Sequence, residues 1–162
     1  MRVFSVLAVV VFSFLVSGHA FAQLGPKGAG GGSSVVDRIT PEQLASALTA
    51  AGYQSQVKTT NDNQKFILAK IHGFNVGIYP GDCKPQGCSN LEWDVYFSDK
   101  VNLDFVNAWN SQKRFVKAYV DKDGQIALSM DTMLVGGVAP ANVVAYAAAF
   151  EYFLGELANF KP

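Results

Sequence analysis

Residues 102–138, NLDFVNAWNSQKRFVKAYVDKDGQIALSMDTMLVGGV, decide the fold of this chain. Their first part has a short helical pattern that is followed by a basic turn. Residues 115–120 and 125–130 then alternate between apolar and polar side chains, with Asp123-Gly124 in the turn between them. An Asp-Gly pair between two alternating runs is a strong local signal for a β-hairpin. The stretch therefore predicts a helix followed by a hairpin.

Regular patterns on both sides of this stretch complete the domain. Thr40, Pro41 and Gln43 have the residue types of an N-cap, a first helical position and a capping box. Gly52 can end that helix in the left-handed conformation. Strands are predicted over residues 53–58, 65–71, 74–79 and 91–97, and a long apolar helix over residues 140–158. This order predicts an α+β fold in which helices pack on an antiparallel β-sheet.

The first 22 residues have the pattern of a secretory signal peptide. Arg2 precedes an apolar run over residues 3–16, and the Ala-Phe-Ala of residues 20–22 offers a small-x-small cleavage site. A transmembrane anchor is the alternative, but Gly18 interrupts the run before the roughly 20 apolar residues that a spanning helix needs. We expect cleavage after Ala22, export to the periplasm or beyond, and no stable membrane insertion of the mature chain.

The mature sequence is expected to be one domain behind a linker. Residues 23–36 are rich in glycine and serine, which is typical of a flexible linker. Residues 37–162 are enough for a single domain with a sizeable core. The 13 basic residues of the full chain balance its 13 acidic ones, without a basic block. This balance argues against nucleic acid as a partner.

The two cysteines of the chain, Cys83 and Cys88, are predicted to form a disulfide. Export places them in an oxidising compartment, and residues 80–88 have the composition of a loop that such a bond would staple. A metal site is the alternative, but two cysteines with only His19 and His72 elsewhere do not supply four ligands once the leader is removed. A redox-active pair usually has two intervening residues. We expect no metal and no cofactor.

Few side chains have chemistry that could support catalysis. His72, at the end of a predicted strand, could act as a base, but no nucleophile motif accompanies it, and a lone histidine is more often structural. Glu92 and Asp94 alternate onto one strand face and could form a carboxylate pair. The simpler interpretation is the solvated side of a sheet whose other side carries Trp93 and Val95.

The predicted last helix has two apolar faces. One is a continuous stripe at helical spacing that should face the sheet: Val143, Ala147, Phe150, Leu154 and Leu157. The other contains Val144, Ala148 and Tyr152, which form a candidate interface with a second copy of the chain or with another protein. The alternative is that the first helix covers this second face, through Leu44 and Leu48.

A family resemblance is carried mainly by Trp109-Asn110, by Arg114-Phe115 and by the pair Gly136-Gly137. Further matching residues lie before, between and after them: Leu103, Phe105, Ala118, Tyr119, Val120, Asp123, Gly124, Leu128, Asp131 and Val138. On these residues, and with its final apolar helix, the chain from about Thr40 onward resembles the YbjN family of bacterial sensory transduction regulators. The leader and the cysteine pair set this chain apart from cytosolic members of the family.

The resemblance implies a fold similar to type III secretion chaperones, often paired as a dimer. It also implies a role in regulation and in protein binding, and it offers no catalytic residues to transfer. We therefore expect an exported, non-enzymatic module that binds a protein or peptide. The alternatives are a small hydrolase that uses His72 with a carboxylate, and a structural protein of the cell envelope. A cleft that holds His72 against a carboxylate would favour the hydrolase, whereas an apolar groove would favour binding.

Overall fold

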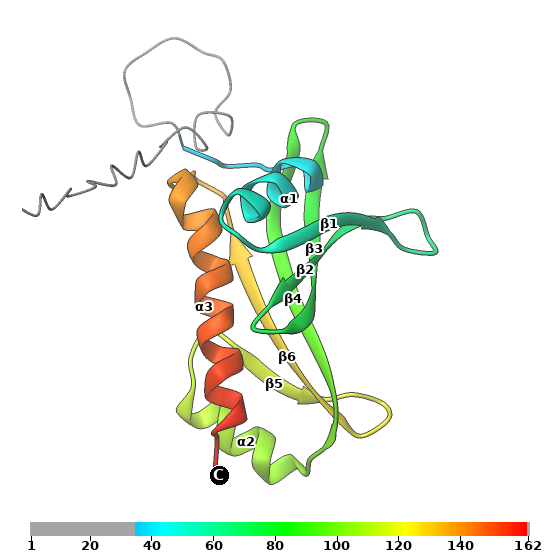
Figure 1. The fold of residues 1–162 in the computed structure, drawn as a ribbon, viewed down its shortest axis with the longest axis vertical. Helices are drawn as coiled ribbons and strands as arrows, with labels where there is room; N and C mark the ends of the chain where they lie inside the picture. The colour runs from blue at the N-terminus through cyan, green and yellow to red at the C-terminus, as the bar shows by residue number, and fades with distance from the viewer. Residues whose placement is uncertain (1–34, 162) are drawn as a thin grey trace, which may run out of the picture.

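The computed structural model describes residues 35–161, which contain three helices and six strands (Figure 1). The helices are α1 (Pro41–Ala50), α2 (Leu103–Gln112) and α3 (Pro140–Ala158). The strands are β1 (Gln54–Thr59), β2 (Lys65–Ile71), β3 (Phe74–Lys84), β4 (Gly87–Lys100), β5 (Lys117–Val120) and β6 (Gln125–Met133). No helix within this part of the chain is long and apolar enough to cross a membrane. The predicted signal peptide and most of the predicted linker lie outside the described residues.

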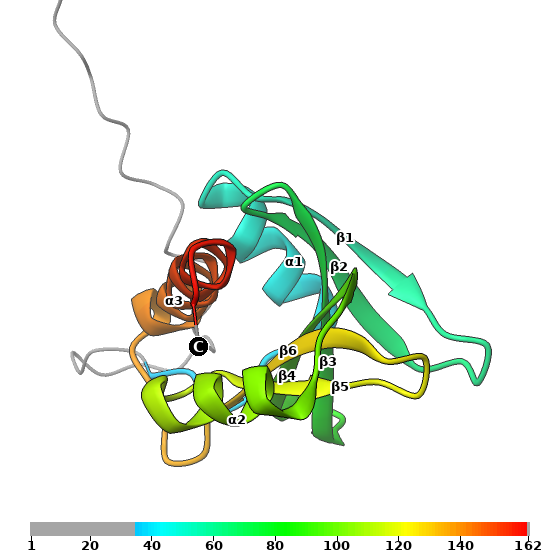
Figure 2. The same ribbon diagram turned by 90° about the horizontal axis from the view of Figure 1, so that it is seen from below.

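The six strands of residues 35–161 form one antiparallel sheet in the order β1-β2-β3-β4-β6-β5. Strands that follow each other along the chain are paired, except that β6 lies between β4 and β5. The chain passes through α2 on its way from β4 to β5, and this longer connection allows β6 to take the inner position. Figure 2 shows the helices together on one side of the curved sheet. The predicted α+β fold is confirmed.

The core lies between this sheet and the helices. Four residues of the predicted α3 stripe, Val143, Ala147, Phe150 and Leu154, are buried there. Phe150 packs against the indole of Trp93 on β4, with ring centroids 6.2 Å apart. The Trp93 indole N–H, which is buried, donates to Thr132 Oγ1 at 3.0 Å, so the largest core side chain leaves no unpaired donor.

Local sequence signals were reliable guides to the ends of the elements. Thr40 and Gln43 form the predicted capping box: Gln43 N–H donates to Thr40 Oγ1 at 3.2 Å, and Thr40 N–H donates to Gln43 Oε1 at 2.9 Å. In the β5–β6 hairpin, Asp121 Oδ1 accepts from two turn N–H groups, and Gly124 has φ +80°. This conformation favours glycine, because it has no Cβ. The predicted hairpin is confirmed.

Three expectations for the strands need correction. The segment of residues 80–88 is not a loop, because β3 and β4 continue through it as paired strands up to Lys84 and Gly87. Phe115 does not start the hairpin strand: its φ is +71°, its side chain is 82% exposed, and β5 begins two residues later at Lys117. Asp94 lies on the sheet face opposite Trp93, as alternation predicted, but it is buried instead of solvated.

Candidate functional site

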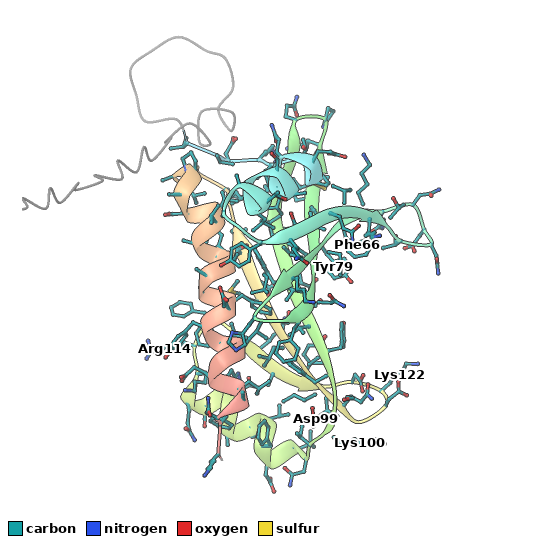
Figure 3. The ribbon with its side chains drawn as sticks, in the orientation of Figure 1. Phe66, Tyr79, Asp99, Lys100, Arg114 and Lys122 are labelled. Atoms are coloured by element: carbon teal, nitrogen blue, oxygen red, sulfur yellow. A yellow bond between two sulfur atoms is a disulfide. The ribbon has the colours of Figure 1, made fainter. Side chains whose placement is uncertain are left out.

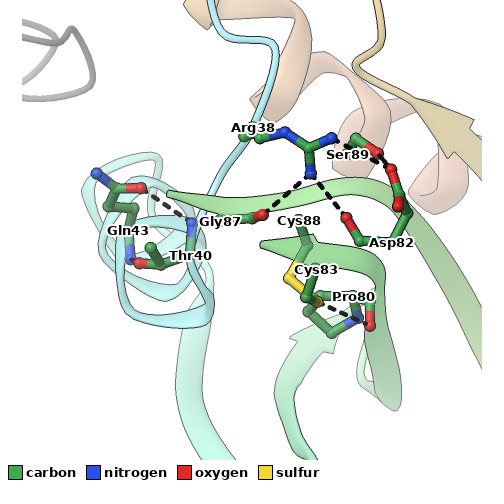
Figure 4. Close-up of a disulfide and its surroundings, with 9 residues drawn as sticks. All are labelled: Arg38, Thr40, Gln43, Pro80, Asp82, Cys83, Gly87, Cys88 and Ser89. Carbon is green, nitrogen blue, oxygen red and sulfur yellow. Dashed lines mark hydrogen bonds and ion pairs between the residues drawn. A yellow bond between two sulfur atoms is a disulfide. The ribbon is translucent and has the colours of Figure 1, made fainter. Parts of the chain in front are cut away.

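Cys83 and Cys88 are joined near the tip of the β3–β4 hairpin, with 2.08 Å between their sulfur atoms (Figure 4). They are directly opposite partners in the strand register, so the bond connects two paired strands. The N-terminal segment docks beside them, where Ile39 and Cys88 exchange two backbone hydrogen bonds of 2.9 Å. The disulfide therefore has a structural position, at the point where the N-terminal segment is attached to the sheet.

Arg38 binds the same hairpin tip through its side chain. The guanidinium donates to the carbonyl oxygens of Asp82 at 2.7 Å and of Gly87 at 3.3 Å, and it forms an ion pair of 3.3 Å with the Asp82 carboxylate (Figure 4). The Ser89 hydroxyl donates to that carboxylate as well. First the Ser89 hydroxyl and then Arg38 hold the pKa of Asp82 below its ordinary value. These groups bind one another, as expected for a structural network.

His72 lies in the tight turn between β2 and β3, where its φ is +51°. The side chain is exposed, its ring faces Phe74 with 6.5 Å between centroids, and the α3 residue next to it is Gly155. Within residues 35–161 no Asp or Glu carboxylate lies within ion-pair distance of the imidazole. The same residues contain no group of three His, Cys, Asp or Glu side chains that could hold a metal. The structure therefore does not assemble the His72–carboxylate pair that the hydrolase alternative requires.

Trp109 and Asn110 fasten α2 to the edge strand β5. Trp109 is fully buried, and its indole N–H donates to the Val116 carbonyl at 3.0 Å. The Asn110 amide makes two hydrogen bonds to the backbone of Ala118: Nδ2 donates to the carbonyl at 3.0 Å, and Oδ1 accepts from the N–H at 2.8 Å. These two residues of the predicted family motif therefore stabilise the fold, and they are not free for a ligand.

The other motif residues divide into structural and exposed positions. Gly136 and Gly137 both have φ +87°, in the turn that leads to α3. A Cβ at Gly137 would approach the side chain of Val35 to 2.7 Å, so this turn packs tightly against the N-terminal segment. Arg114 and Phe115 are exposed, in the connection between α2 and β5. The fold does not bury these two side chains, which leaves them available to a partner.

The predicted interface on α3 is at the surface. Ala148 is exposed, Tyr152 is 61% exposed, and Val144 is half-buried. Leu44 and Leu48 of α1 are buried elsewhere in the core and leave Ala148 and Tyr152 uncovered. The face is thus available in a single chain, although its occupation by a second copy stays a prediction.

The same face extends toward the end of α2. Glu156, one helical turn after Tyr152, accepts a hydrogen bond of 2.6 Å from Lys113 Nζ. This ion pair brings the exposed Arg114–Phe115 connection to the C-terminal end of the α3 face. An exposed tyrosine and an exposed phenylalanine therefore belong to neighbouring parts of one surface.

An apolar pocket opens where α2 and the C-terminal half of α3 meet the sheet. Its walls include three phenylalanines from three different elements, Phe74 on β3, Phe97 on β4 and Phe105 on α2. Leu154 and Leu157 of α3 close the opposite side. The pocket has a volume of about 460 Å³, which is within the range of cavities that hold small ligands or single large side chains.

Two charged residues stand among the apolar lining of this pocket. Asp99 and Lys100 are the last two residues of β4, and Figure 3 shows both close to the junction of β4 and α2. Both are exposed, and neither forms an ion pair with another residue in the part of the chain that the structure describes. The pocket can therefore offer apolar contacts inside and one charge of each sign at its mouth.

The pocket is not predictable from the sequence. The predicted strands contain Phe74 and Phe97, and the predicted helix contains Phe105, but these patterns do not show how far each ring is covered. Their rings are only partly covered: Phe74 is 38% exposed, and it meets Phe97 edge to face with 5.1 Å between centroids. No local pattern shows that three aromatic residues from three separate elements line one opening, because that depends on how α3 crosses the sheet.

The possible carboxylate pair Glu92 and Asp94 lies on the sheet face that the helices leave open. Glu92 is exposed, whereas Asp94 is buried beneath neighbouring side chains. Burial raises the pKa of Asp94 above its ordinary value, and the neighbouring Ser129 hydroxyl offsets part of that rise. Asp94 is therefore a carboxyl group that the fold holds in an unfavourable environment.

Comparison with known proteins places the chain in one family. Residues 40–152 match the family model described as "YbjN: Putative bacterial sensory transduction regulator". The match covers α1 through most of α3, including all six strands described above. A search of curated proteins returned no significant match.

Proposed function

The chain belongs to the YbjN family, and from this membership and its apolar pocket we propose that it is an exported regulatory module that acts by binding a protein or peptide. The pocket between α2, α3 and the sheet is the observation that carries the proposal. A non-enzymatic role is part of it, because the exposed His72 has no carboxylate at ion-pair distance within residues 35–161. Regulation would then follow from occupancy of the pocket.

The chemistry of the pocket favours an apolar side chain of a peptide as the occupant. Phe74, Phe97 and Phe105 provide ring surfaces that are partly uncovered, and burial of a large apolar side chain against them would contribute about 1.5–3 kcal/mol. Asp99 and Lys100 can contact the peptide groups on either side of that anchor. The Asp99 carboxylate can accept from a backbone N–H, and the Lys100 ammonium can donate to a backbone carbonyl. One buried anchor with a polar rim is the usual anatomy of a small protein interface.

The proposal can be tested by selecting peptides on the exported chain, beginning at Gln23. We expect peptides selected from a random phage-displayed library to share one large apolar residue, and to bind with measurable affinity by fluorescence polarisation. The variant Phe97→Gln, which places an amide in the pocket wall, should weaken these peptides at least tenfold, about 1.4 kcal/mol. Phe66→Gln is the matched control, because Phe66 is a half-buried aromatic residue on the opposite face of the sheet.

Two results would overturn the proposal. Selected peptides that bind wild type and Phe97→Gln equally, while both proteins melt normally, would show that the pocket is not the site. Cleavage of a generic ester or peptide substrate that is abolished by His72→Gln would favour the hydrolase instead.

Export is tested separately. Expression of the full chain in a Gram-negative host should yield periplasmic protein with Gln23 as its first residue, according to N-terminal mass spectrometry. Cytoplasmic protein that retains residues 1–22 would contradict this part of the proposal.

A further inference from the structure

The face of the sheet opposite the helices carries a band of four aromatic rings. Phe66 on β2 stacks on Tyr79 on β3 with 5.2 Å between centroids, and Figure 3 shows the two side by side, away from α3. Tyr96 on β4 meets Tyr119 on β5 edge to face at 6.3 Å, and their hydroxyl oxygens are 3.1 Å apart. Because strands are about 4.8 Å apart, the band from β2 to β5 is roughly 19 Å wide.

Three carboxylates lie in or beside this band. Glu92 and Asp131 are directly opposite each other in the β4–β6 register, and Asp94 lies two residues after Glu92 on the same face. Like charges in directly opposite positions destabilise a sheet. Lys117, 3.3 Å from Asp131, is the cation that pairs with this group among the described residues. Lys58, opposite Phe66, and Lys70 lie on the same face but over β1 and β2, so the negative charge is concentrated over β4 and β6, where one lysine stands against three acidic residues.

Asp94 lies at the centre of the band and beneath it. Its exposed fraction is 7%, and within residues 35–161 neither its Oδ1 nor the Oγ of Ser129, opposite it on β6, has a hydrogen-bond partner of good geometry. Gly77 is opposite Asp94 in the β3–β4 register, and the ring of Tyr79 occupies the space that a side chain there would fill. A Cβ at Gly77 would come within 2.8 Å of that ring. The rings thus cover the carboxylate without hydrogen-bonding to it, and the Ser129 hydroxyl opposite it on β6 offsets only part of the rise in its pKa.

The pKa values of two tyrosine hydroxyls near Asp94 are raised as well. Burial is the main cause that raises the pKa of the Tyr119 hydroxyl, and the carboxyl of Asp94 contributes to the rise. The pKa of the Tyr79 hydroxyl is raised in the same way, first by burial and then by Tyr96 and Asp94. The geometry agrees, because the Tyr79 ring lies over Gly77, opposite Asp94, and the hydroxyls of Tyr96 and Tyr119 are 3.1 Å apart on the same face.

An unsatisfied buried carboxylate brings no benefit to the isolated fold. Removing a buried polar group from water without giving it a partner is destabilising, and native proteins contain few such groups. The faces of tyrosine rings are themselves the negative part of the ring quadrupole. Rings and carboxylates therefore add their fields in the same direction, and both would be stabilised by a positive charge.

We infer that this tyrosine–carboxylate face binds a basic segment of a partner protein, with an arginine or lysine side chain set against the tyrosine rings above Asp94. Charge complementarity is the reason for a basic partner, and aromatic rings attract guanidinium and ammonium groups by cation–π interaction. The width of the band favours a segment over a single small cation, because an extended chain of about six residues spans roughly 19 Å. This face lies across the sheet from the apolar pocket, so the two proposed sites can be tested independently of each other.

The probe for this inference is an acetylated, amidated peptide of alternating glycine and arginine with three arginines. A matched peptide in which citrulline replaces arginine has almost the same shape and hydrogen-bonding groups, but no charge. We expect the arginine peptide to bind the exported chain and to shift the amide NMR signals of Asp94 and Ser129. The citrulline peptide should bind at least tenfold more weakly.

Two variants separate the contribution of the Asp94 charge from that of the aromatic rings. Asp94→Asn keeps the size of the side chain and should weaken the arginine peptide about tenfold, whereas Tyr119→Phe keeps the ring and should leave binding within twofold. Equal binding of the arginine and citrulline peptides, or unchanged binding to Asp94→Asn, would overturn the inference. If free arginine amide binds as tightly as the peptide, the ligand of this face is a small cation, and the inference of a basic segment is wrong. Phe97→Gln should not affect this probe.

Asp94→Asn also has a stability readout, because the pKa of Asp94 is raised from its ordinary value of 3.8. The folded state then holds the proton more tightly than the unfolded state, so wild type loses stability as pH rises from near 3.8 through the raised pKa. The variant should melt above wild type at pH 7, and the difference should vanish below about pH 3. The titratable groups that face Asp94 are Glu92, Lys117, Asp131, Tyr79, Tyr96 and Tyr119. A variant that melts below wild type at pH 7 would show that the carboxylate is satisfied, and would remove the basis of the inference.

Discussion

Replacing Asn110 by alanine should destabilise the domain by about 1–3 kcal/mol, because two hydrogen bonds worth roughly 0.5–1.5 kcal/mol each are lost. The bonds join the Asn110 amide to the N–H and the carbonyl of Ala118, at 2.8 and 3.0 Å. Asn110 is a surface residue, so propensity alone would favour alanine in this helix and would predict a gain in stability. The two arguments therefore predict opposite signs.

The structural reason for the expected loss is the position of β5. This strand is at one edge of the sheet, and its other neighbour is β6. The backbone groups of Ala118 that bind Asn110 point away from β6, so the amide of Asn110 takes the place of a further strand. An uncovered edge exposes unpaired groups to water and to other chains. Asn110 satisfies this edge with one side chain and fixes α2 to it.

Urea unfolding followed by tryptophan fluorescence would measure this loss, and Asn107→Ala is the matched control. Asn107 is an exposed asparagine on the same helix, and no side-chain hydrogen bond of Asn107 occurs within residues 35–161. Its replacement should change the free energy of unfolding by less than about 0.5 kcal/mol. Asn110→Asp adds a sharper test, because a carboxylate can accept from the Ala118 N–H but cannot donate to the carbonyl. That variant should gain stability as its carboxyl becomes protonated at low pH. If Asn110→Ala unfolds within 0.5 kcal/mol of wild type, the clamp is not an energetic feature of the fold.

Three further predictions concern the core, the hairpin tip and the α3 face. Trp109→Ala should cost about 3–5 kcal/mol, because the indole is fully buried; melting within two degrees of wild type would contradict this. Cys83 and Cys88 should resist alkylation without reductant, and their double replacement by serine should cost about 2 kcal/mol by loop entropy, which urea unfolding would measure. Sedimentation equilibrium should show a wild-type dimer that Val144→Glu with Tyr152→Glu converts to a folded monomer; a wild-type monomer at every concentration would exclude the dimer.

The parts of the fold that were predictable from sequence are those specified by near neighbours in the chain. The Thr40–Gln43 capping box and the Asp123-Gly124 turn each depend on groups within three or four residues, so composition at fixed spacing identifies them. The α3 stripe depends only on helical periodicity. These features do not need information about tertiary packing.

The extended β3 and β4 strands show where such reasoning failed. Pro80, Gly81 and Asp82 have the composition of a loop, and proline is excluded from central strands because it lacks an N–H. However, the registered pairing of β2 with β3 ends at Ile78, so beyond that residue β3 is an edge on one side. Pro80 pairs only with β4, opposite Leu91, and its missing N–H leaves no neighbour unsatisfied there. The exception depends on where the pairing of β2 with β3 ends, which no signal near Pro80 contains.

The burial of Asp94 was unpredictable for a related reason. Alternation assigned it correctly to the face opposite Trp93, but alternation gives the side of a sheet and not the depth beneath neighbouring side chains. That depth depends on Gly77, which belongs to another strand and gives the Tyr79 ring room to fold over its neighbour. The pocket phenylalanines have the same character, because their partial exposure follows from the path of α3 over the sheet.

Phe115 and Asp94 each break a local rule of structure. Phe115 holds a left-handed φ of +71° although it is bulky, and its ring is 82% exposed. Such a conformation costs of the order of 1–3 kcal/mol, and burial does not offset it here. Asp94 has the converse problem of a buried carboxylate with an unpaired oxygen. Sequences tend to break local rules at functional positions, because selection there acts on binding as well as on stability. Phe115 adjoins the α3 face and Asp94 lies under the tyrosines, so both exceptions coincide with surfaces that this fold leaves open to partners.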